Sequence, residues 1–146
     1  MWTYLADRFG VARADLAGFE LVRRSGDFWL VSAATDPARD AETMGIRFVR
    51  DQEIGFKPTT YALQFLGDAV ADARVQVDRT ELLRLLEGGT VDRDVSDGYV
   101  ALVYDDRIAG CGLSRRGTVE SMIPKGRAQE LQEILEEKEG EKRGLG

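Results

Sequence analysis

The first part of the chain alternates apolar and polar residues in short runs that predict one helix and one hairpin. Apolar residues recur at helical spacing from Trp2 to Phe9, and Gly10 follows as a stop signal, so we expect a short amphipathic helix there. Two apolar runs, Phe19 to Arg23 and Phe28 to Ser32, flank a Ser-Gly-Asp turn. This arrangement predicts a β-hairpin.

A third strand and a second helix are expected in the next segment. After a polar stretch from Thr35 to Glu42, which reads as a loop, residues 45–50 alternate apolar and charged side chains. That pattern predicts a strand with one face in water. Residues 57–60, Lys-Pro-Thr-Thr, introduce a helix because either threonine can cap it. The residues expected to line its apolar side are Tyr61, Phe65 and Ala69.

The second half begins with a well-delimited helix and continues with closely spaced strands. Asp78 stands at the N-cap position, Glu81 at the capping-box position, and Gly88 at the end of a leucine-rich stretch. The strands that follow are expected at residues 90–95, 99–104, 108–113 and 119–123, separated by Asp-Gly, Asp-Asp and Arg-Arg-Gly turns. Short strands at this spacing favour a small barrel that the helix packs against.

A final helix is expected from Arg127 to Glu137, followed by a flexible charged tail over residues 138–146. The order of elements predicts an α+β fold with two modules. We place an α+β module at residues 1–72 and a largely antiparallel β pseudobarrel at residues 73–137.

The amino-acid composition argues against several classes of function. The 146 residues contain one cysteine, Cys111, and no histidine, so an internal disulfide is impossible and the usual metal ligands are nearly absent. The commonest general base near neutral pH is missing as well. The chain shows neither an export signal nor an apolar run long enough for a membrane span. We therefore expect a cytoplasmic protein that is not an enzyme and holds no metal or cofactor.

The net charge of −6 argues against nucleic-acid binding until its distribution is considered. Residues 107–127 carry a net charge of +4, whereas residues 129–146 carry −3. A local basic patch can therefore exist on an acidic chain.

Three stretches of the second half together resemble a PUA domain. They are Glu81-Leu-Leu-Arg-Leu-Leu-Glu-Gly-Gly-Thr-Val91, Asp97-Gly-Tyr-Val-Ala-Leu-Val103 and Ile108-Ala-Gly-Cys-Gly-Leu113. In that family a helix ends in a glycine pair, a strand opens with Asp-Gly-Tyr, and a hairpin strand closes the pseudobarrel. The order of the three parts makes the resemblance specific.

The resemblance extends in both directions through Met44–Arg50, Lys57–Gln64 and Ser121–Arg127. These segments look like the pre-PUA and PUA tail of archaeal NOL/NOP/Sun-type RNA cytosine-5-methyltransferases. The layout is also similar to small ribosome-biogenesis factors that consist of these two modules alone. Because the chain lacks a Rossmann domain, a glycine-rich nucleoside loop and a Pro-Cys motif, the resemblance implies RNA binding without methyl transfer.

Candidate RNA-binding residues follow from position and charge. A turn at Arg115-Arg116-Gly117 presents guanidinium groups to phosphate, and Lys125 and Arg127 lie where a strand passes into a helix and can face one phosphate. If the four cations converge on phosphates, they form one basic face. The remaining candidates are Gly88, Gly89 and Thr90 at a helix-to-strand turn, and Arg47 and Lys57 on the first module.

Each candidate also has an ordinary structural explanation. The arginine pair can be a solvated turn, Gly88 a helix C-cap, and Cys111 a small buried residue, since no histidine is present to activate a thiol. Three functions stay open at this point. The chain can bind rRNA or tRNA directly, it can supply RNA binding to a separate methyltransferase or ribosome-assembly partner, or, least favoured, it can act on RNA as an enzyme.

Overall fold

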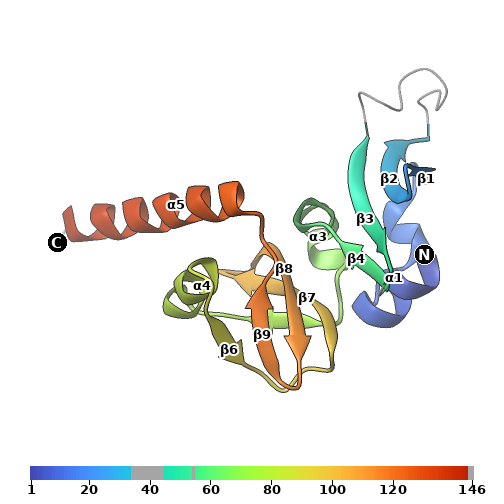
Figure 1. The fold of residues 1–146 in the computed structure, drawn as a ribbon. Coiled ribbons are helices and arrows are strands. Elements are labelled where there is room, and N and C mark those ends of the chain that lie inside the picture. The colour runs from blue at the N-terminus through green and yellow to red at the C-terminus, as the bar shows by residue number, and fades with distance from the viewer. Residues whose placement is uncertain (34–44, 54, 145–146) are drawn as a thin grey trace.

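A computed structural model describes residues 1–33, 45–53 and 55–144 of the chain, which fold into two sheets with helices around them (Figure 1). The predicted loop from Thr35 to Glu42 lies outside these residues. The elements of the first half are α1 (Trp2–Phe9), the 3-10 turn η1 (Arg13–Leu16), β1 (Phe19–Arg24), β2 (Asp27–Ser32), β3 (Ile46–Gln52), β4 (Gly55–Pro58), α3 (Thr60–Leu66) and η2 (Gly67–Ala69).

The elements of the second half complete the α+β fold that the sequence predicted. They are β5 (Arg74–Gln76), α4 (Arg79–Leu86), β6 (Thr90–Asp92), β7 (Gly98–Tyr104), β8 (Arg107–Arg115), β9 (Thr118–Ser121) and α5 (Lys125–Gly144). The first sheet has the order β1-β2-β3-β4 and the second the order β5-β7-β8-β9-β6. Among the described residues, no helix combines the length and apolar content that crossing a bilayer requires.

The first sheet is antiparallel throughout and contains the predicted hairpin. Arg24 pairs with Asp27, and the two residues between them, Ser25 and Gly26, both have positive φ angles of 52° and 87°. Positive φ at both central positions gives a turn whose twist matches that of the strands, as in type I′ hairpins. The hairpin and the third strand are thus confirmed, while β4 was not predicted.

Helix α1 is confirmed with its stop at Gly10, whose φ of 67° is left-handed. Helix α3 is confirmed with Thr59 as its cap, since the Thr59 side chain accepts a hydrogen bond from the Ala62 amide. The predicted apolar side of α3 is wrong. Tyr61 and Phe65 are 55% and 44% exposed, and the buried face consists of Thr60, Ala62, Leu63 and Leu66.

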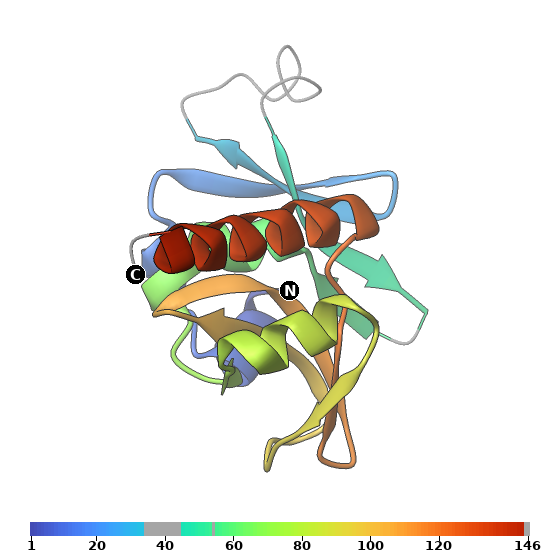
Figure 2. The ribbon, with the colours of Figure 1, turned by 90° about the vertical axis from the view of Figure 1, so that its left-hand side faces the viewer.

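The second sheet curls into a half-barrel, which is more open than the predicted pseudobarrel (Figure 2). Four of its strands are antiparallel to their neighbours, but β5 runs parallel to β7. The edge strands β5 and β6 are only three residues long and do not pair with each other.

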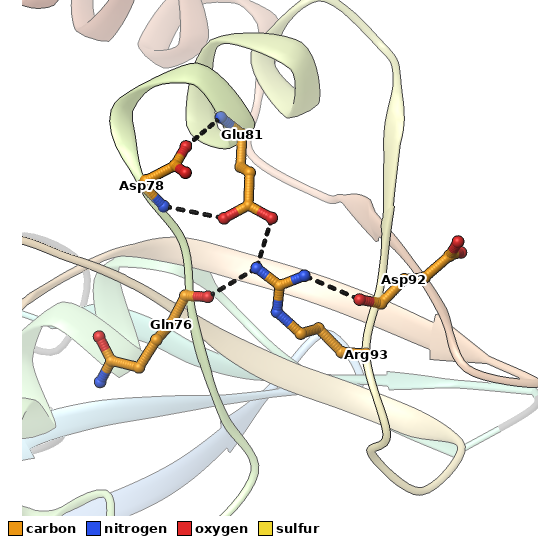
Figure 3. Close-up of polar contacts among 5 residues, drawn as sticks. All are labelled: Gln76, Asp78, Glu81, Asp92 and Arg93. Carbon is orange, nitrogen blue, oxygen red and sulfur yellow. Dashed lines mark hydrogen bonds and ion pairs between the residues drawn. The ribbon is translucent and has the colours of Figure 1, made fainter.

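A side chain joins these two edges instead (Figure 3). Arg93, which follows β6, donates from Nη2 to the Gln76 carbonyl on β5 at 3.1 Å, and from Nη1 to the Asp92 carbonyl at 2.7 Å. Its Nη2 also pairs with the carboxylate of Glu81 on α4. We refer to Arg93, Gln76 and Glu81 as the edge clamp. It ties β5, β6 and α4 together without a backbone ladder.

Helix α4 confirms the predicted capping box. The Asp78 carboxylate accepts from the Glu81 amide at 2.8 Å, and the Glu81 carboxylate accepts from the Asp78 amide at 3.1 Å. The helix packs Leu82 and Leu85 into the core of the half-barrel. Local capping and apolar spacing therefore gave the correct element at this place.

Helix α5 is longer than predicted. It continues to Gly144, whereas the sequence placed its end at Glu137 and a flexible tail at residues 138–146. The extension is rich in glutamate and lysine, which are good helix formers, and opposite charges recur along it at helical spacing. Low hydrophobicity alone was thus a poor guide to where the helix ends.

The described residues form two cores, one inside the half-barrel and one under the first sheet that draws residues from both halves. The core under the first sheet includes Phe9, Phe48 and Leu63 from the first half and Val103 and Cys111 from the second. Arg8 adds polar contacts across the junction, donating from Nε to the Tyr99 carbonyl at 2.7 Å and to Ser96 through both other nitrogens. The segments on either side of the predicted division at residues 72 and 73 therefore pack against each other, and the division itself stays a prediction.

Candidate nucleic-acid interface

The predicted arginine turn lies at the tip of the β8–β9 hairpin. Arg115 pairs with Thr118, and the turn residues Arg116 and Gly117 both have positive φ. Both arginines are exposed. The Arg116 amide donates to the Asp97 carboxylate at 2.8 Å, so the tip is bound to a segment that also contains Asp92 and Asp94. These carboxylates offset the positive charge of the tip.

The other two predicted cations lie at the opposite end of the same hairpin. Lys125 is the exposed first residue of α5, and Arg127 forms an ion pair with Glu130 at 2.9 Å. Strand β9 separates this helix start from Arg116, and its four residues alone span about 13 Å. The four cations therefore form two groups, one at each end of β9, and RNA contact by either group stays a prediction.

The glycine pair has a local structural cause. Gly88 has a φ of 94°, and the Gly89 amide donates to the Arg84 carbonyl at 2.8 Å, as expected where a helix ends. A Cβ on Gly89 would lie 2.6 Å from Cγ of Arg84. Thr90 is exposed and pairs with Glu120 at the α5 end of β9. Helix termination thus accounts for both glycines, and RNA contact at this turn stays a prediction.

The remaining predicted cations, Arg47 and Lys57, belong to the first sheet. A β-bulge interrupts the pairing of β2 and β3, so that Phe48 and Val49 both turn into the core and are fully buried. A bulge re-aims the flanking side chains. Consequently Arg47 and Arg50 share the opposite face, which we call the outer face, and Lys57 pairs in register with Arg50.

Trp29 lies at the centre of the outer face, between arginines from the strands on either side. The guanidinium carbon of Arg24 on β1 is 5.2 Å from the centre of the Trp29 ring, and that of Arg47 on β3 is 5.3 Å away. Arg47 also pairs with the Asp27 carboxylate at 3.4 Å. Arg24 and Arg47 therefore flank one half-buried tryptophan, and Arg50 and Lys57 lie further along the same face.

Sequence reasoning named Arg47 and Lys57 but not Arg24 or Trp29. The signal that could have found them is the hairpin register: a two-residue turn at Ser25-Gly26 places Val22 opposite Trp29 and Arg24 on the same face. The contact of Arg47 with the Trp29 ring depends on the bulge, and no local sequence pattern predicts that bulge.

Lys57 links this face to the second half. Its Nζ lies 6.0 Å from the centre of the Tyr99 ring, at the junction of the two sheets. The nearby thiol of Cys111 is 1% exposed, and burial raises its pKa to about 12. Among the described residues, no group of histidine, cysteine or carboxylate side chains is arranged to hold a metal ion.

The glycines beside Cys111 are explained by packing. A Cβ on Gly110 would lie 2.4 Å from a side-chain carbon of Ile123, and one on Gly112 would lie 2.9 Å from Leu102. The Cys111 amide donates to Thr60 Oγ1 at 3.1 Å. The Gly-Cys-Gly run thus lets α3 and the core approach β8 closely, and Cys111 is a small buried residue within it.

A cleft of about 920 Å³ lies along α5, between this helix and the β7–β8 turn. Its walls mix acidic and basic side chains, namely Asp68, Asp105 and Asp106 with Arg74, Arg107, Arg127 and Lys138. Because the signs alternate, the cleft does not concentrate positive charge as the outer face does.

Comparison of the sequence with protein-family models finds no match, and comparison with curated proteins finds none either. The arrangement of side chains itself must therefore carry the functional argument, and it favours the outer face of the first sheet as the candidate interface.

Proposed function

We propose that this protein binds structured RNA through the outer face of its first sheet, without catalysing a reaction. The observation that carries the proposal is the position of four cations from β1, β3 and β4 on one face: Arg24 and Arg47 flank Trp29, and Arg50 lies further along β3 with Lys57 beside it. Cations that neutralise phosphate supply most of the affinity of such interfaces, and aromatic rings among them stack on bases.

The distribution of charge supports this assignment. In a chain of net charge −6, an acidic average is expected on any surface chosen at random. Among the described residues, the outer face instead places four cations with two carboxylates, Asp27, which pairs with Arg47, and Glu20, which shares the face of Arg24 on β1. A local field of this sign attracts a polyanion even when the whole molecule is acidic.

The resemblance of the sequence to pre-PUA and PUA modules adds the biological setting. On that basis we propose a cytoplasmic role in rRNA or tRNA modification or in ribosome biogenesis. The half-barrel with a capped helix at α4 is compatible with a PUA-like domain. The buried, protonated thiol of Cys111 offers no nucleophile, which agrees with binding rather than catalysis.

A second function has its own observation. Tyr61 and Phe65 lie one helical turn apart on α3 and are exposed, and the Phe65 ring contacts the exposed Phe19 ring at a centroid distance of 5.4 Å. Exposed aromatic clusters mark protein contacts. This patch would suit a subunit that brings RNA to a separate methyltransferase, while the outer face holds the RNA.

RNA affinity measured across a salt series tests the main proposal. Arg47→Gln with Lys57→Gln should weaken binding to every RNA sequence, because the contacts are to phosphate. The slope of log affinity against log salt should fall by about 0.7 for each lost contact on single strands, or about 1.4 for the pair.

A charge-matched control is available in Arg107→Gln with Lys138→Gln, which removes two exposed cations beside the cleft. This control should keep the wild-type slope. Equal losses in both double variants would show that only the overall charge matters and would overturn the assignment of the outer face. An unchanged slope in the Arg47 and Lys57 pair would do the same.

A further inference from the structure

We propose that Trp29 is a stacking site for one unpaired nucleobase, and that Arg24 leaves the ring to make room for it. The inference rests on the RNA binding proposed above and specifies what part of the RNA is bound. A site of this kind selects single-stranded or bulged nucleotides, because bases inside a duplex have no free face to stack.

The position of the ring fits such a role. Trp29 is on an inner strand of the sheet and points away from the core that holds its neighbours Phe28 and Leu30. The helices and the second sheet lie on the core side (Figure 2). A tryptophan that faces away from a core gains little from folding, yet it presents the largest stacking surface among the side chains.

The two arginines on the ring are held unequally. Arg47 is anchored by the Asp27 carboxylate at 3.4 Å in addition to its ring contact. Within the part of the chain that the structure describes, the ring is the contact found for Arg24, and its Nη2 is buried without a hydrogen-bond partner. Buried donors without a partner are rare and costly. Arg24 is therefore the side chain that can leave without breaking a hydrogen bond.

A nucleotide would supply what Arg24 lacks. Its base can replace the guanidinium on the ring, and its phosphate offers oxygen acceptors to the displaced Nη2. Arg47 keeps its place and closes the other side of the ring. The exchange trades a cation–ring contact and an unpartnered donor for a base stack and a charge-assisted hydrogen bond.

Tryptophan fluorescence can test the stack directly. The chain has two tryptophans, so Trp2→Phe leaves Trp29 as the emitter. An oligouridylate of about ten nucleotides should quench Trp29 as it binds, because a base lies on the ring. Inorganic polyphosphate of similar charge should bind without quenching. The same oligonucleotide with abasic residues throughout should behave like polyphosphate.

Substitutions can test separately whether binding needs an aromatic ring at position 29 and whether it needs the Arg24 side chain. Trp29→Leu should weaken oligouridylate binding about tenfold, whereas Trp29→Phe should restore most of it, because only the aromatic face is required. Arg24→Ala should keep the quenching at saturation but lower the salt slope by about 0.7, because a phosphate contact is lost.

The matched control is Arg13→Ala. Arg13 lies 5.2 Å from the centre of the Trp2 ring, the same distance as Arg24 from Trp29, but away from the outer face. It is tested in the chain that retains both tryptophans and should change neither affinity nor slope. Thermal unfolding of each variant confirms that the comparison is between folded proteins.

The outcomes distinguish this inference from the function on which it rests. Binding without quenching, together with wild-type affinity in Trp29→Leu, would overturn the stacking site and leave RNA binding standing. Absence of binding by any RNA would overturn both. Equal quenching by polyphosphate would show that charge alone moves Arg24 and would also overturn the stack.

Discussion

The two sheets use their arginines in different ways. In the first sheet, guanidinium groups lie against aromatic rings, as Arg23 does on Phe28 and Arg24 does on Trp29. In the second half, guanidinium groups donate hydrogen bonds to backbone carbonyls, as Arg93 does to Gln76 and Arg74 does to Val70. A guanidinium that satisfies carbonyls is part of the fold, whereas one stacked on a ring keeps donors for a ligand.

The two sheets also differ in how much of their strands is buried. Residues Ile108 to Ser114 of β8 are all buried, so this strand is covered on both faces, whereas β6 and β9 alternate buried and exposed residues. Strand β1 has no fully buried residue. A strand buried on both faces can contact RNA only at its ends, while strands with one open face can offer a surface. The comparison thus points to the first sheet for binding and to the second for stability.

The largest effect expected from a single substitution is loss of the core that joins the sheets. Phe48 is fully buried among residues of both halves, so Phe48→Ala should lower the free energy of unfolding by about 3–5 kcal/mol. Because the core is shared, the fall should affect the whole chain. Denaturation followed by tryptophan fluorescence, which reports the first half, and by far-UV circular dichroism should give coincident transitions. Separate transitions would contradict the shared core and favour two independent modules.

The next effect should be confined to the edge clamp. Arg93→Ala removes three hydrogen bonds and leaves the Glu81 carboxylate without its cation, so we expect a loss of about 2–3 kcal/mol. Arg107→Ala, an exposed cation on β8, serves as the control and should cost less than about 0.5 kcal/mol. Equal stability of the two variants in urea would show that the half-barrel does not need the clamp.

The clamp should also respond to acid. The hydrogen bond from Arg93, followed by that from the Asp78 amide, lowers the pKa of Glu81 below its ordinary value of 4.5. A lowered pKa stabilises the fold above the unfolded value, and this contribution is lost as pH falls through the folded value. The stability difference between wild type and Arg93→Ala should therefore be constant above about pH 5 and shrink below it. A difference that grows in acid would contradict the role of Glu81.

Much of the fold could be predicted from sequence because its signals are local. The capping box at Asp78 and the turn at Ser25-Gly26 involve residues three or fewer positions apart, and both are confirmed. Strand β5 has only three residues and pairs with β7, which lies more than twenty positions away. No periodicity can appear in so short a strand, and no local rule gives its parallel partner.

The candidate site was harder to predict for a related reason. Arg116 and Lys125 are close in sequence, and this proximity suggested one surface, but an extended strand between them carries them apart. Arg24, Trp29 and Arg47 are spread over the sequence and come together only through hairpin register and a bulge. Charge can be read from sequence, whereas convergence depends on register.

A smaller effect is expected inside the second sheet. Cys111→Ser replaces a buried thiol whose pKa is raised to about 12, and the hydroxyl can keep the contact that Sγ makes with the Gly112 carbonyl at 3.6 Å. The cost should be about 1–2 kcal/mol, with RNA affinity within about threefold of wild type. Loss of a measurable activity on RNA with stability intact would instead favour an enzyme.

The smallest effect on folding, and the sharpest test of the comparison, concerns the two ends of the β8–β9 hairpin. Arg116 and Lys125 are exposed, so Arg116→Ala and Lys125→Ala should each change stability by less than about 0.5 kcal/mol. If both ends contact phosphate, the double variant should lower the salt slope by about 1.4 on single strands, and each single variant by about 0.7. Asp97 and its neighbours offset the charge near Arg116, and Glu130 holds Arg127 beside Lys125, so we expect smaller changes than from Arg47 and Lys57. Affinity across a salt series for the singles and the double checks this ranking. A larger change at the hairpin than at the outer face would reverse the comparison and return the interface to the second sheet.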